Sequence, residues 1–372
     1  MRIGMISPYS LSVPGGVQNQ ILSLGRALRQ RGVSVRVLGP CDGPPPESFV
    51  TPLGNSVPTG ANGSVAPLAP DPAAQLRTIR ALRDEEFDLL HLHEPMAPGP
   101  TMTAMLVKST PIVATFHAAG RSRAYEVFRP FTARGANRID IRFAVSDDAE
   151  ALAHRWLGGT YERAFNGVEV DRFRKEPRTT NNTPVVFFLA RHEDRKGLAV
   201  LLEAFARLDV PCTLWVGGLG PETDSLRQKF AGDDRIEWLG EIDDDEKVKR
   251  MRRADIFCAP SLHGESFGIV LLEAMAAETT VIASALSGYR KVVECPNGKA
   301  AGMLVEPGSA EGLCSGLREL LNDVEQREAL VEVGADRVTA FSMARLADLY
   351  TCLLYTSPSP RDRTRSRMPS SA

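Results

Sequence analysis

Short β-rich apolar runs alternate with segments of helical periodicity along nearly the whole chain. After the first run, Val17, Ile21, Leu24 and Leu28 fall on one face of a helix. Strand–helix alternation of this kind predicts a mainly parallel sheet that helices cover on both faces. The predicted strands span 2–6, 33–38, 88–91, 112–115, 142–145, 185–190, 212–216, 236–239, 256–259 and 280–283.

One break interrupts this alternation. Residues 170–184 are polar, charged and bounded by proline, which is typical of a linker. The pattern therefore predicts an α/β protein of two Rossmann-like, doubly wound domains facing across a cleft, with ligands at the carboxyl ends of the strands. We expect domains at 1–168 and 169–340, and a helix over 341–356 that returns to the first domain. Residues 42–72, rich in proline and glycine, predict a long loop.

Composition narrows the class of protein. The 372 residues are 43% hydrophobic and 24% charged, which is typical of a soluble globular chain too long for one core. We expect no membrane span and no secretory signal, because no apolar run is long enough. Six cysteines lie far apart, which favours free thiols in a reducing cytoplasm. Residues 357–372 have no apolar pattern, so we expect disorder there, and they are also typical of translated vector sequence rather than native protein.

Charge is distributed unevenly along the chain. The first 168 residues carry 17 basic and 14 acidic side chains, whereas residues 169–356 carry 23 basic and 31 acidic ones. A basic half beside an acidic half favours an anionic surface or ligand for the first domain. Uneven solvated charge explains the same count equally well.

Two glycine clusters follow predicted strands. Gly15 and Gly16 open a helix, where backbone amides can approach a phosphate, although an ordinary tight turn fits them equally well. The second cluster, 217–220, only begins a dinucleotide-binding fingerprint, and we interpret it as a structural turn.

Two cations flank a short loop that follows the predicted strand 185–190. Arg191 and Lys196 at the carboxyl end of a strand suit a diphosphate, the guanidinium as a planar fork and the ammonium as a point charge. A solvated charged loop is the alternative interpretation.

The strongest signal is a pair of glutamates, Glu265 and Glu273, at the start of an apolar helical segment. They lie about 12 Å apart along a helix axis, so they would reach different parts of an extended ligand rather than share a proton. The amides of Phe267 and Gly268 can meet a phosphate between them. A buried Glu273 needs a polar partner, which suggests ligand hydroxyl groups; a capping glutamate is the alternative.

Three histidines lie on or after predicted strands. His91 and His93 share one face of a strand, but no third ligand of suitable spacing accompanies them, so we expect no metal site. His117 ends a strand where a site residue would lie, and a core histidine fits that place equally well.

These elements occur in an order that resembles a known family. Gly15-Gly16, His117, Arg191 with Lys196, and the two glutamates follow the pattern of retaining, nucleotide-sugar-dependent glycosyltransferases of family 4, which have the GT-B fold. Within that family, the segments DLLHLHEPMAP and RRADIFCAPSLHGESFGIVLLEAMA are similar to those of actinobacterial phosphatidyl-myo-inositol mannosyltransferases. The resemblance covers about residues 1–354.

The resemblance implies roles by position. It implies catalytic roles for His117, Arg191, Lys196 and Glu265. It implies a donor site for GDP-mannose made of Gly15, Gly16, Arg191, Lys196, Ile242, Asp244, Lys247, Glu265, Phe267, Gly268, Ile269 and Glu273. It implies an acceptor side with Tyr9, Asn62, Ser64 and His117, to which Arg121 and Arg123 are our own addition. The family needs no metal ion.

The chain departs from the subfamily mostly on the acceptor side. Arginine is usual there at the positions of Pro67 and Ala69, and asparagine at that of Met96. These changes remove partners of an acceptor phosphate, so the resemblance implies the donor more firmly than the acceptor. On the donor side, Glu278 stands where glycine is usual.

The segment 118–142 holds six arginines among aromatic residues, which fits an anionic membrane surface and, equally, a solvated helix face. We expect no nucleic-acid partner, because no such module is present. Together with these features, the resemblance implies a cytoplasmic hexosyltransferase at the inner face of the plasma membrane. It would transfer α-mannose from GDP-mannose to phosphatidylinositol or a related lipid. The alternatives are a UDP-sugar donor, another acceptor, an epimerase and a non-catalytic binding protein.

Overall fold

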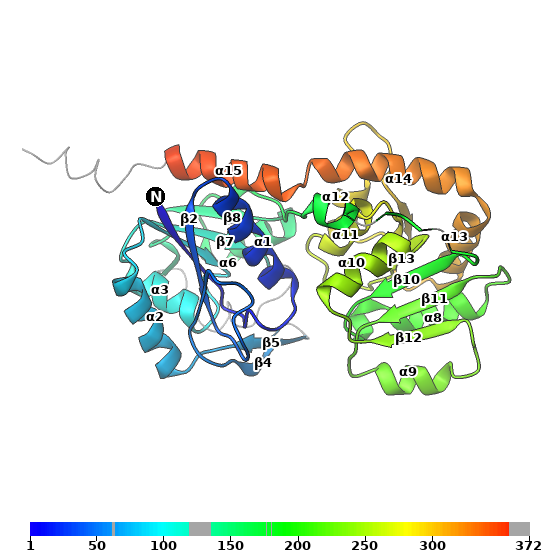
Figure 1. Ribbon diagram of the computed structural model, residues 1–372, viewed down its shortest axis with the longest axis horizontal. Helices are drawn as coiled ribbons and strands as arrows, with labels where there is room; N and C mark the ends of the chain where they lie inside the picture. The colour runs from blue at the N-terminus through cyan, green and yellow to red at the C-terminus, as the bar shows by residue number, and fades with distance from the viewer. Residues whose placement is uncertain (62–63, 119–134, 176, 180, 357–372) are drawn as a thin grey trace, which may run out of the picture. The chain divides into compact units, whose positions relative to one another are not determined.

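The computed structural model describes residues 1–372 apart from 62–63, 119–134, 176, 180 and 357–372. The chain forms two compact units (Figure 1). Residues 168–342 make the second unit, and the first unit contains 1–167 together with the C-terminal segment that begins at Met343.

The first unit is built on a seven-stranded parallel sheet. Strand order runs β3-β2-β1-β6-β7-β8-β9, so the direction of winding reverses between β1 and β6, the place where such sheets bind ligands. The strands are β1 (Arg2–Ile6), β2 (Ser34–Gly39), β3 (Val50–Pro52), β6 (Leu89–His93), β7 (Ile112–Phe116), β8 (Ile141–Ala144) and β9 (Glu162–Arg163). Its helices are α1 (Gly16–Gln30), α2 (Pro72–Asp84), α3 (Pro100–Val107), α6 (Asp147–Leu157) and α15 (Met343–Thr356).

The prediction of a long loop over residues 42–72 is wrong. The segment contains β3 and an antiparallel hairpin of β4 (Val57–Ala61) and β5 (Ser64–Leu68). Pro58 faces Pro67 in the register of that hairpin. A two-stranded ribbon tolerates proline because its outer edges need no partner, whereas the composition alone indicates a loop.

The C-terminal helix α15 packs against α1 within the first unit, as the red and blue helices of Figure 1 show. Arg31 binds Asp348 at 2.7 Å and donates to the carbonyl of Ala344 at 2.8 Å. The buried Leu346 and Tyr350 join the same apolar cluster as Ile21 of α1. Burial of this face explains why a helix at the end of the chain belongs to the unit at its beginning.

The second unit holds a six-stranded parallel sheet in the order β12-β11-β10-β13-β14-β15, with a reversal between β10 and β13. The strands are β10 (Val185–Leu189), β11 (Thr213–Gly217), β12 (Ile236–Gly240), β13 (Ile256–Ala259), β14 (Thr280–Ser284) and β15 (Met303–Val305). Its helices are α7 (Val170–Arg174), η1 (Asp194–Lys196), α8 (Leu198–Ala206), α9 (Thr223–Lys229), α10 (Asp244–Arg253), α11 (Ile269–Ala276), α12 (Ser287–Val293), α13 (Ala310–Asn322) and α14 (Val324–Thr339).

The prediction of a linker over 170–184 is wrong for its first residues. They form α7, which belongs to the second unit and packs on α10 and α11. Phe173 is buried there and explains the docking, since it is the one aromatic side chain in that polar segment. None of the described helices is long and apolar enough to cross a bilayer.

Candidate active site

Lys196 and Glu265 meet in the second unit, although 69 positions separate them. The ammonium group of Lys196 contacts Oε1 of Glu265, and both side chains are mostly buried. The same carboxylate oxygen accepts a hydrogen bond from the Ser261 hydroxyl at 3.2 Å and lies 3.4 Å from the Arg195 guanidinium. Lys196 follows β10 and Glu265 follows β13, so the two strands beside the reversal of the sheet supply the pair.

Arg191 reaches this pair only through other side chains. Its Nε lies 3.2 Å from Glu193, whose second carboxylate oxygen lies 3.1 Å from Nε of Arg195. The guanidinium of Arg191 is therefore linked to Glu265 by way of Glu193 and Arg195. Because the Arg191 side chain is nearly half exposed, it remains accessible to an anionic ligand.

Close backbone packing fixes the two loops that carry these residues. Gly197 has a φ of 70°, and a Cβ there would collide with the carbonyl oxygen of Pro260. The amide of Leu262 donates to the carbonyl of Arg195 at 2.8 Å. A Cβ on Gly288 would lie 2.5 Å from the carbonyl oxygen of Glu265. Glycine is required where backbones approach this closely, so the loops hold Lys196 and Glu265 in place.

Helix α11 begins directly after this centre. Its N-cap, Gly268, has a φ of 93°, and no side chain of the described residues caps the first turn. The aromatic ring of Tyr289 occupies the space that a Cβ on Gly268 would need, and its hydroxyl bonds Ser261 at 3.0 Å. Uncapped amides and the helix dipole make this end of α11 suited to an anion.

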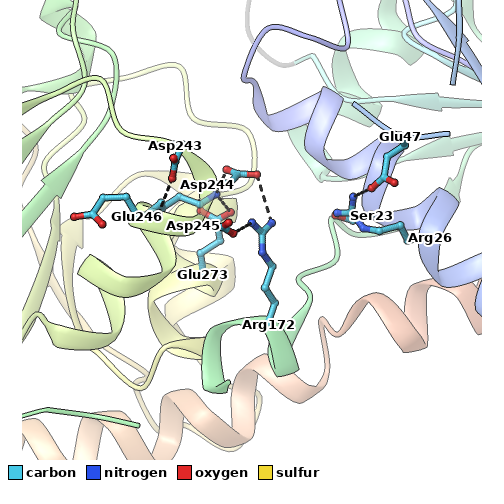
Figure 2. A network of polar contacts seen from close by, with 10 residues as sticks. Ser23, Arg26, Glu47, Arg172, Asp243, Asp244, Asp245, Glu246 and Glu273 are labelled. Atoms are coloured by element: carbon cyan, nitrogen blue, oxygen red, sulfur yellow. Dashed lines mark hydrogen bonds and ion pairs between the residues drawn. The ribbon is translucent and has the colours of Figure 1, made fainter. Parts of the chain in front are cut away.

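A second polar cluster surrounds Lys247 on α10, and Figure 2 shows its acidic members with Arg172. Lys247 lies 2.9 Å from Glu273 and 3.1 Å from Asp244, while Arg172 of α7 lies 3.4 Å from Asp244. The sequence analysis inferred a ligand hydroxyl group at Glu273 from its need for a polar partner, and Lys247 already meets that need. Periodicity within one helix cannot show a partner on another.

The charges of this cluster hold its members ionised. Burial alone would raise the pKa of Asp244, but Lys247 and Arg172 hold that pKa below its usual value. Burial likewise would lower the pKa of Lys247, and Glu273 with Asp244 keeps it above its usual value. Asp244 therefore offers a carboxylate to a ligand at neutral pH.

Glu278, at a position where the resemblance implies glycine, adopts a φ of 56°. Arg252 holds its carboxylate at 2.6 Å and Arg174 at 3.4 Å. The hydrogen bond from Arg252 is the main reason that the pKa of Glu278 is lowered. These ion pairs compensate the backbone strain of a left-handed residue without a glycine.

The glycine cluster 217–220 forms a structural turn. The amide of Gly218 donates to Gly240 at 2.7 Å, and that of Gly220 donates to the hydroxyl of Thr223 at 2.9 Å. Ile242 lies beside this turn, 3.5 Å from the position of a Cβ on Gly217.

In the first unit, the predicted acceptor residue His117 follows β7 and is buried. The amides of His117 and Ala118 both donate to one oxygen of Glu94. Burial is the main reason that the pKa of Glu94 is raised. Tyr9 lies near the same carboxylate, and burial raises its pKa, with a smaller contribution from the charge of Glu94.

The glycines of the first unit open α1. Gly15 is the N-cap with an extended backbone, and no described side chain caps the helix. A Cβ on Gly15 would lie 2.7 Å from Cδ of Gln18, so the two are in close contact. Gly16 is the first helical residue, where a free amide can meet an anion.

Part of the predicted acceptor side lies outside the described residues. Asn62, Arg121 and Arg123 belong to that part, and the backbone of Ser64 pairs with Ala61 in the hairpin. Of the six arginines in 118–142, Arg138 and Arg142 are described. Arg138 donates to the carbonyls of Met105 and Leu106, and Arg142 to those of Ala136 and Gly158, so both stabilise the unit itself.

Sequence reasoning missed several residues of these clusters. Glu193 and Arg195 lie in the loop between Arg191 and Lys196. Their opposite charges were the signal in the sequence that could have indicated ion pairs within this loop. Arg172 lies in the segment interpreted as a linker. Among the described residues, no group of three histidine, cysteine or acidic side chains is arranged to hold a metal ion.

Comparisons with known proteins identify the family. Residues 14–172 match the model "Glycosyltransferase Family 4", and residues 169–337 match "Glycosyl transferases group 1". The phosphatidyl-myo-inositol mannosyltransferase of Mycobacterium leprae is 42% identical, with 93% of this chain and 94% of that protein aligned. The protein of the same name from Mycolicibacterium smegmatis is 41% identical over 91% of this chain and 89% of its own length.

Solved glycosyltransferases share the fold at low sequence identity. Anabaena HepE, in complex with UDP and glucose, superposes with a TM-score of 0.74 at 18% identity, covering 96% of this chain and all of its own. WaaG, a glycosyltransferase of lipopolysaccharide biosynthesis, gives 0.69 at 18% identity over the same shares. The predicted GT-B fold is confirmed. The chain therefore belongs to glycosyltransferase family 4, among the relatives of the phosphatidyl-myo-inositol mannosyltransferases.

Proposed function

We propose that the protein is a retaining hexosyltransferase that moves α-mannose from GDP-mannose to phosphatidyl-myo-inositol or a related lipid. Its glycosyltransferase family membership rests on the comparisons, and the names of the relatives suggest the donor and the acceptor. The observation that carries the proposal is the contact of Lys196 with Glu265 beside the uncapped start of α11.

In the proposed reaction, the bond between the anomeric carbon and the diphosphate oxygen breaks, and GDP leaves with the electron pair. A hydroxyl oxygen of the acceptor bonds to that carbon, and its proton passes to the departing diphosphate. Lys196, Arg191 and the amides of α11 would stabilise the negative charge that develops. Such preorganised charge stabilisation needs no metal ion and is usually a large part of catalysis.

The ion pair of Lys196 with Glu265 is compatible with binding and release of the donor. Without a ligand, the two charges neutralise each other and hold both side chains in position. An arriving diphosphate would draw Lys196, and the carboxylate of Glu265 would then accept hydrogen bonds from hexose hydroxyl groups. Arg195 and Ser261 would keep Glu265 oriented during this exchange, because both bind the same oxygen.

We infer that the cluster around Lys247 receives the nucleoside. Guanine presents N–H donors that match the ionised carboxylate of Asp244, whereas the edge of uracil also presents acceptors. Glu273, fixed by Lys247, would accept a hydrogen bond from a ribose hydroxyl with its remaining capacity. In this scheme Gly15 and Gly16 contribute backbone amides to the diphosphate, and His117 and Tyr9 belong to the acceptor side.

A peripheral place on the inner membrane surface is also proposed. On α2, Leu76 is 68% exposed and Ile79 is 37% exposed, although both are large apolar residues. Arg80 and Arg83 lie on the same helix. Exposed apolar side chains accompanied by arginines favour shallow binding to an anionic lipid surface.

A different acceptor is the second candidate. Ala69 and Met96 are buried and apolar at positions where the subfamily usually has arginine and asparagine. An acceptor phosphate would find no charged partner at either position, which favours a lipid or soluble acceptor with another head group.

A donor-by-acceptor assay tests both candidates. The protein is supplied with GDP-mannose or UDP-glucose, and with vesicles that contain or lack phosphatidylinositol. Mannosylated phosphatidylinositol formed only from GDP-mannose is the expected product. Transfer from UDP-glucose, or to a different lipid, would replace the proposed donor or acceptor, and donor turnover without transfer would contradict the proposal.

A further inference from the structure

A row of buried imidazoles lies at the carboxyl ends of β6 and β7. His91 and His93 alternate along β6 and face the same side, with ring centroids 4.3 Å apart. The ring of His93 stacks on that of His117 at 5.3 Å, and Nδ1 of His93 lies 3.0 Å from Nε2 of His117. All three are at least nine-tenths buried. The proposed function places His117 on the acceptor side, but it assigns nothing to His93.

Nδ1 of His93 and Nε2 of His117 lie 3.0 Å apart, so one of these nitrogens donates and the other accepts. Burial lowers the pKa of His117 to about 4 and holds that of His93 well below its usual value, so both rings are neutral near pH 7. Each ring therefore carries a single N–H, on either Nδ1 or Nε2.

The remaining nitrogen of His93 decides which ring donates. Nε2 of His93 is buried and has no hydrogen-bond partner among the described residues. If His93 carried its proton on Nε2, that buried N–H would have no acceptor among them, which is unfavourable. With the proton on Nδ1, His93 donates it to Nε2 of His117, and its single N–H is paired.

We propose that His93 is a positioning residue that holds the imidazole of His117 through an N–H···N hydrogen bond from its Nδ1. This rests on the proposed function of His117 at the acceptor side. This hydrogen bond fixes the ring of His117. Its backbone is fixed by the hydrogen bonds that the amides of His117 and Ala118 donate to Glu94. Side chain and main chain of His117 are thus oriented before a substrate arrives, which is how supporting residues contribute to catalysis.

His91 provides a matched control. It lies on the same strand at the same depth, but its Nε2 bonds the hydroxyl of Thr115 at 2.7 Å, which in turn lies 2.7 Å from the hydroxyl of Tyr350. The described contacts of His91 do not include a hydrogen bond to His117. Substitution of His91 therefore reproduces the burial change without removing the donor to His117.

The spectroscopic test needs no substrate. In protein labelled with 15N-histidine, the six histidines give few imidazole signals. We expect a proton on Nδ1 of His93 with a scalar coupling to Nε2 of His117 through the hydrogen bond. The signal should be absent in His93→Leu, which assigns it to His93. A proton on Nε2 of His117 would overturn the assignment.

The kinetic test compares variants of the whole 372-residue chain. His93→Asn places an amide N–H near the position of Nδ1 and should keep kcat within about threefold, whereas His93→Leu and His93→Gln should lose about tenfold, the cost of about one hydrogen bond. His91→Gln should retain kcat. Equal losses in His93→Asn and His93→Gln would contradict positioning by Nδ1. If the parent protein itself transfers no sugar, the proposed function fails while the imidazole spectrum still tests the hydrogen bond.

Discussion

The ammonium group of Lys247 lies 2.9 Å from a carboxylate oxygen of Glu273, and both side chains are mostly buried. The two residues come from α10 and α11, so this ion pair joins neighbouring helices of the second unit. Removing one partner of a buried pair leaves the other charge without compensation.

Glu273→Ala should therefore lower the free energy of unfolding by about 2 kcal/mol, less than for an isolated buried pair because Asp244 still contacts Lys247. Urea unfolding followed by tryptophan fluorescence measures this change, because Trp215 and Trp238, two of the three tryptophans, lie in the second unit. Glu246→Ala, which breaks a more exposed pair with Arg250, should cost about 0.5–1 kcal/mol. An equal decrease in the free energy of unfolding in both variants would show that the buried pair stabilises the protein no more than the other pair.

Asp244→Asn should weaken GDP binding about tenfold and affect UDP less, because the amide replaces one carboxylate acceptor of the guanine N–H groups by a donor. Calorimetric titration with each nucleotide measures the two affinities. Asp245→Asn is the matched control, since Asp245 also contacts Arg172 but its side chain is 84% exposed. An equal loss of GDP and UDP affinity in Asp244→Asn would argue against base recognition.

Acidification should destabilise the first unit through its buried histidines. Burial lowers the pKa of His91 to about 3 and that of His117 to about 4, and it holds that of His93 well below its usual value. Below about pH 6.5 the unfolded chain binds protons that the native chain does not, so stability is lost as pH falls. Each histidine contributes about 1.4 kcal/mol per pH unit.

Glu94 opposes this effect by at most one proton, because burial raises its pKa in the native state. The net slope should then be about 3 kcal/mol per pH unit below pH 6. Thermal unfolding between pH 7 and pH 5 measures it, and His91→Gln should reduce the slope. A melting temperature that stays constant across this range would contradict neutral burial of the three rings.

Gly288→Ala should reduce turnover through Glu265. The new methyl group would lie 2.5 Å from the carbonyl oxygen of Glu265 and must displace that loop. Overpacking of this kind costs about 1–3 kcal/mol, and a shifted carboxylate loses its position on the hexose. Gly232→Ala, where nothing lies within 4 Å, is the control and should leave kcat unchanged. Unchanged kcat in both variants would mean that the position of this loop does not matter.

The strands and their parallel order followed from the sequence because buried parallel strands are continuous apolar runs, as in Val185–Leu189. The closeness of Lys196 and Glu265 could also be predicted, because each follows a strand and the two strands are adjacent in the same sheet. The partner of Glu273 could not be predicted, because Lys247 lies on another helix and no local pattern links them. The hairpin over 57–68 could not be predicted either, because its prolines are typical of loops rather than strands.

The donor centre is tested most directly by measuring mannose transfer from GDP-mannose to phosphatidylinositol vesicles by Lys196→Ala and Glu265→Gln. Lys229→Ala serves as the control, because Lys229 pairs with Glu203 at the exposed surface. We predict that kcat falls at least about a hundredfold in both site variants, with the fold retained, since each loses a preorganised charge. Turnover within twofold of the parent protein in both variants would contradict the assignment of Lys196 and Glu265 to the donor.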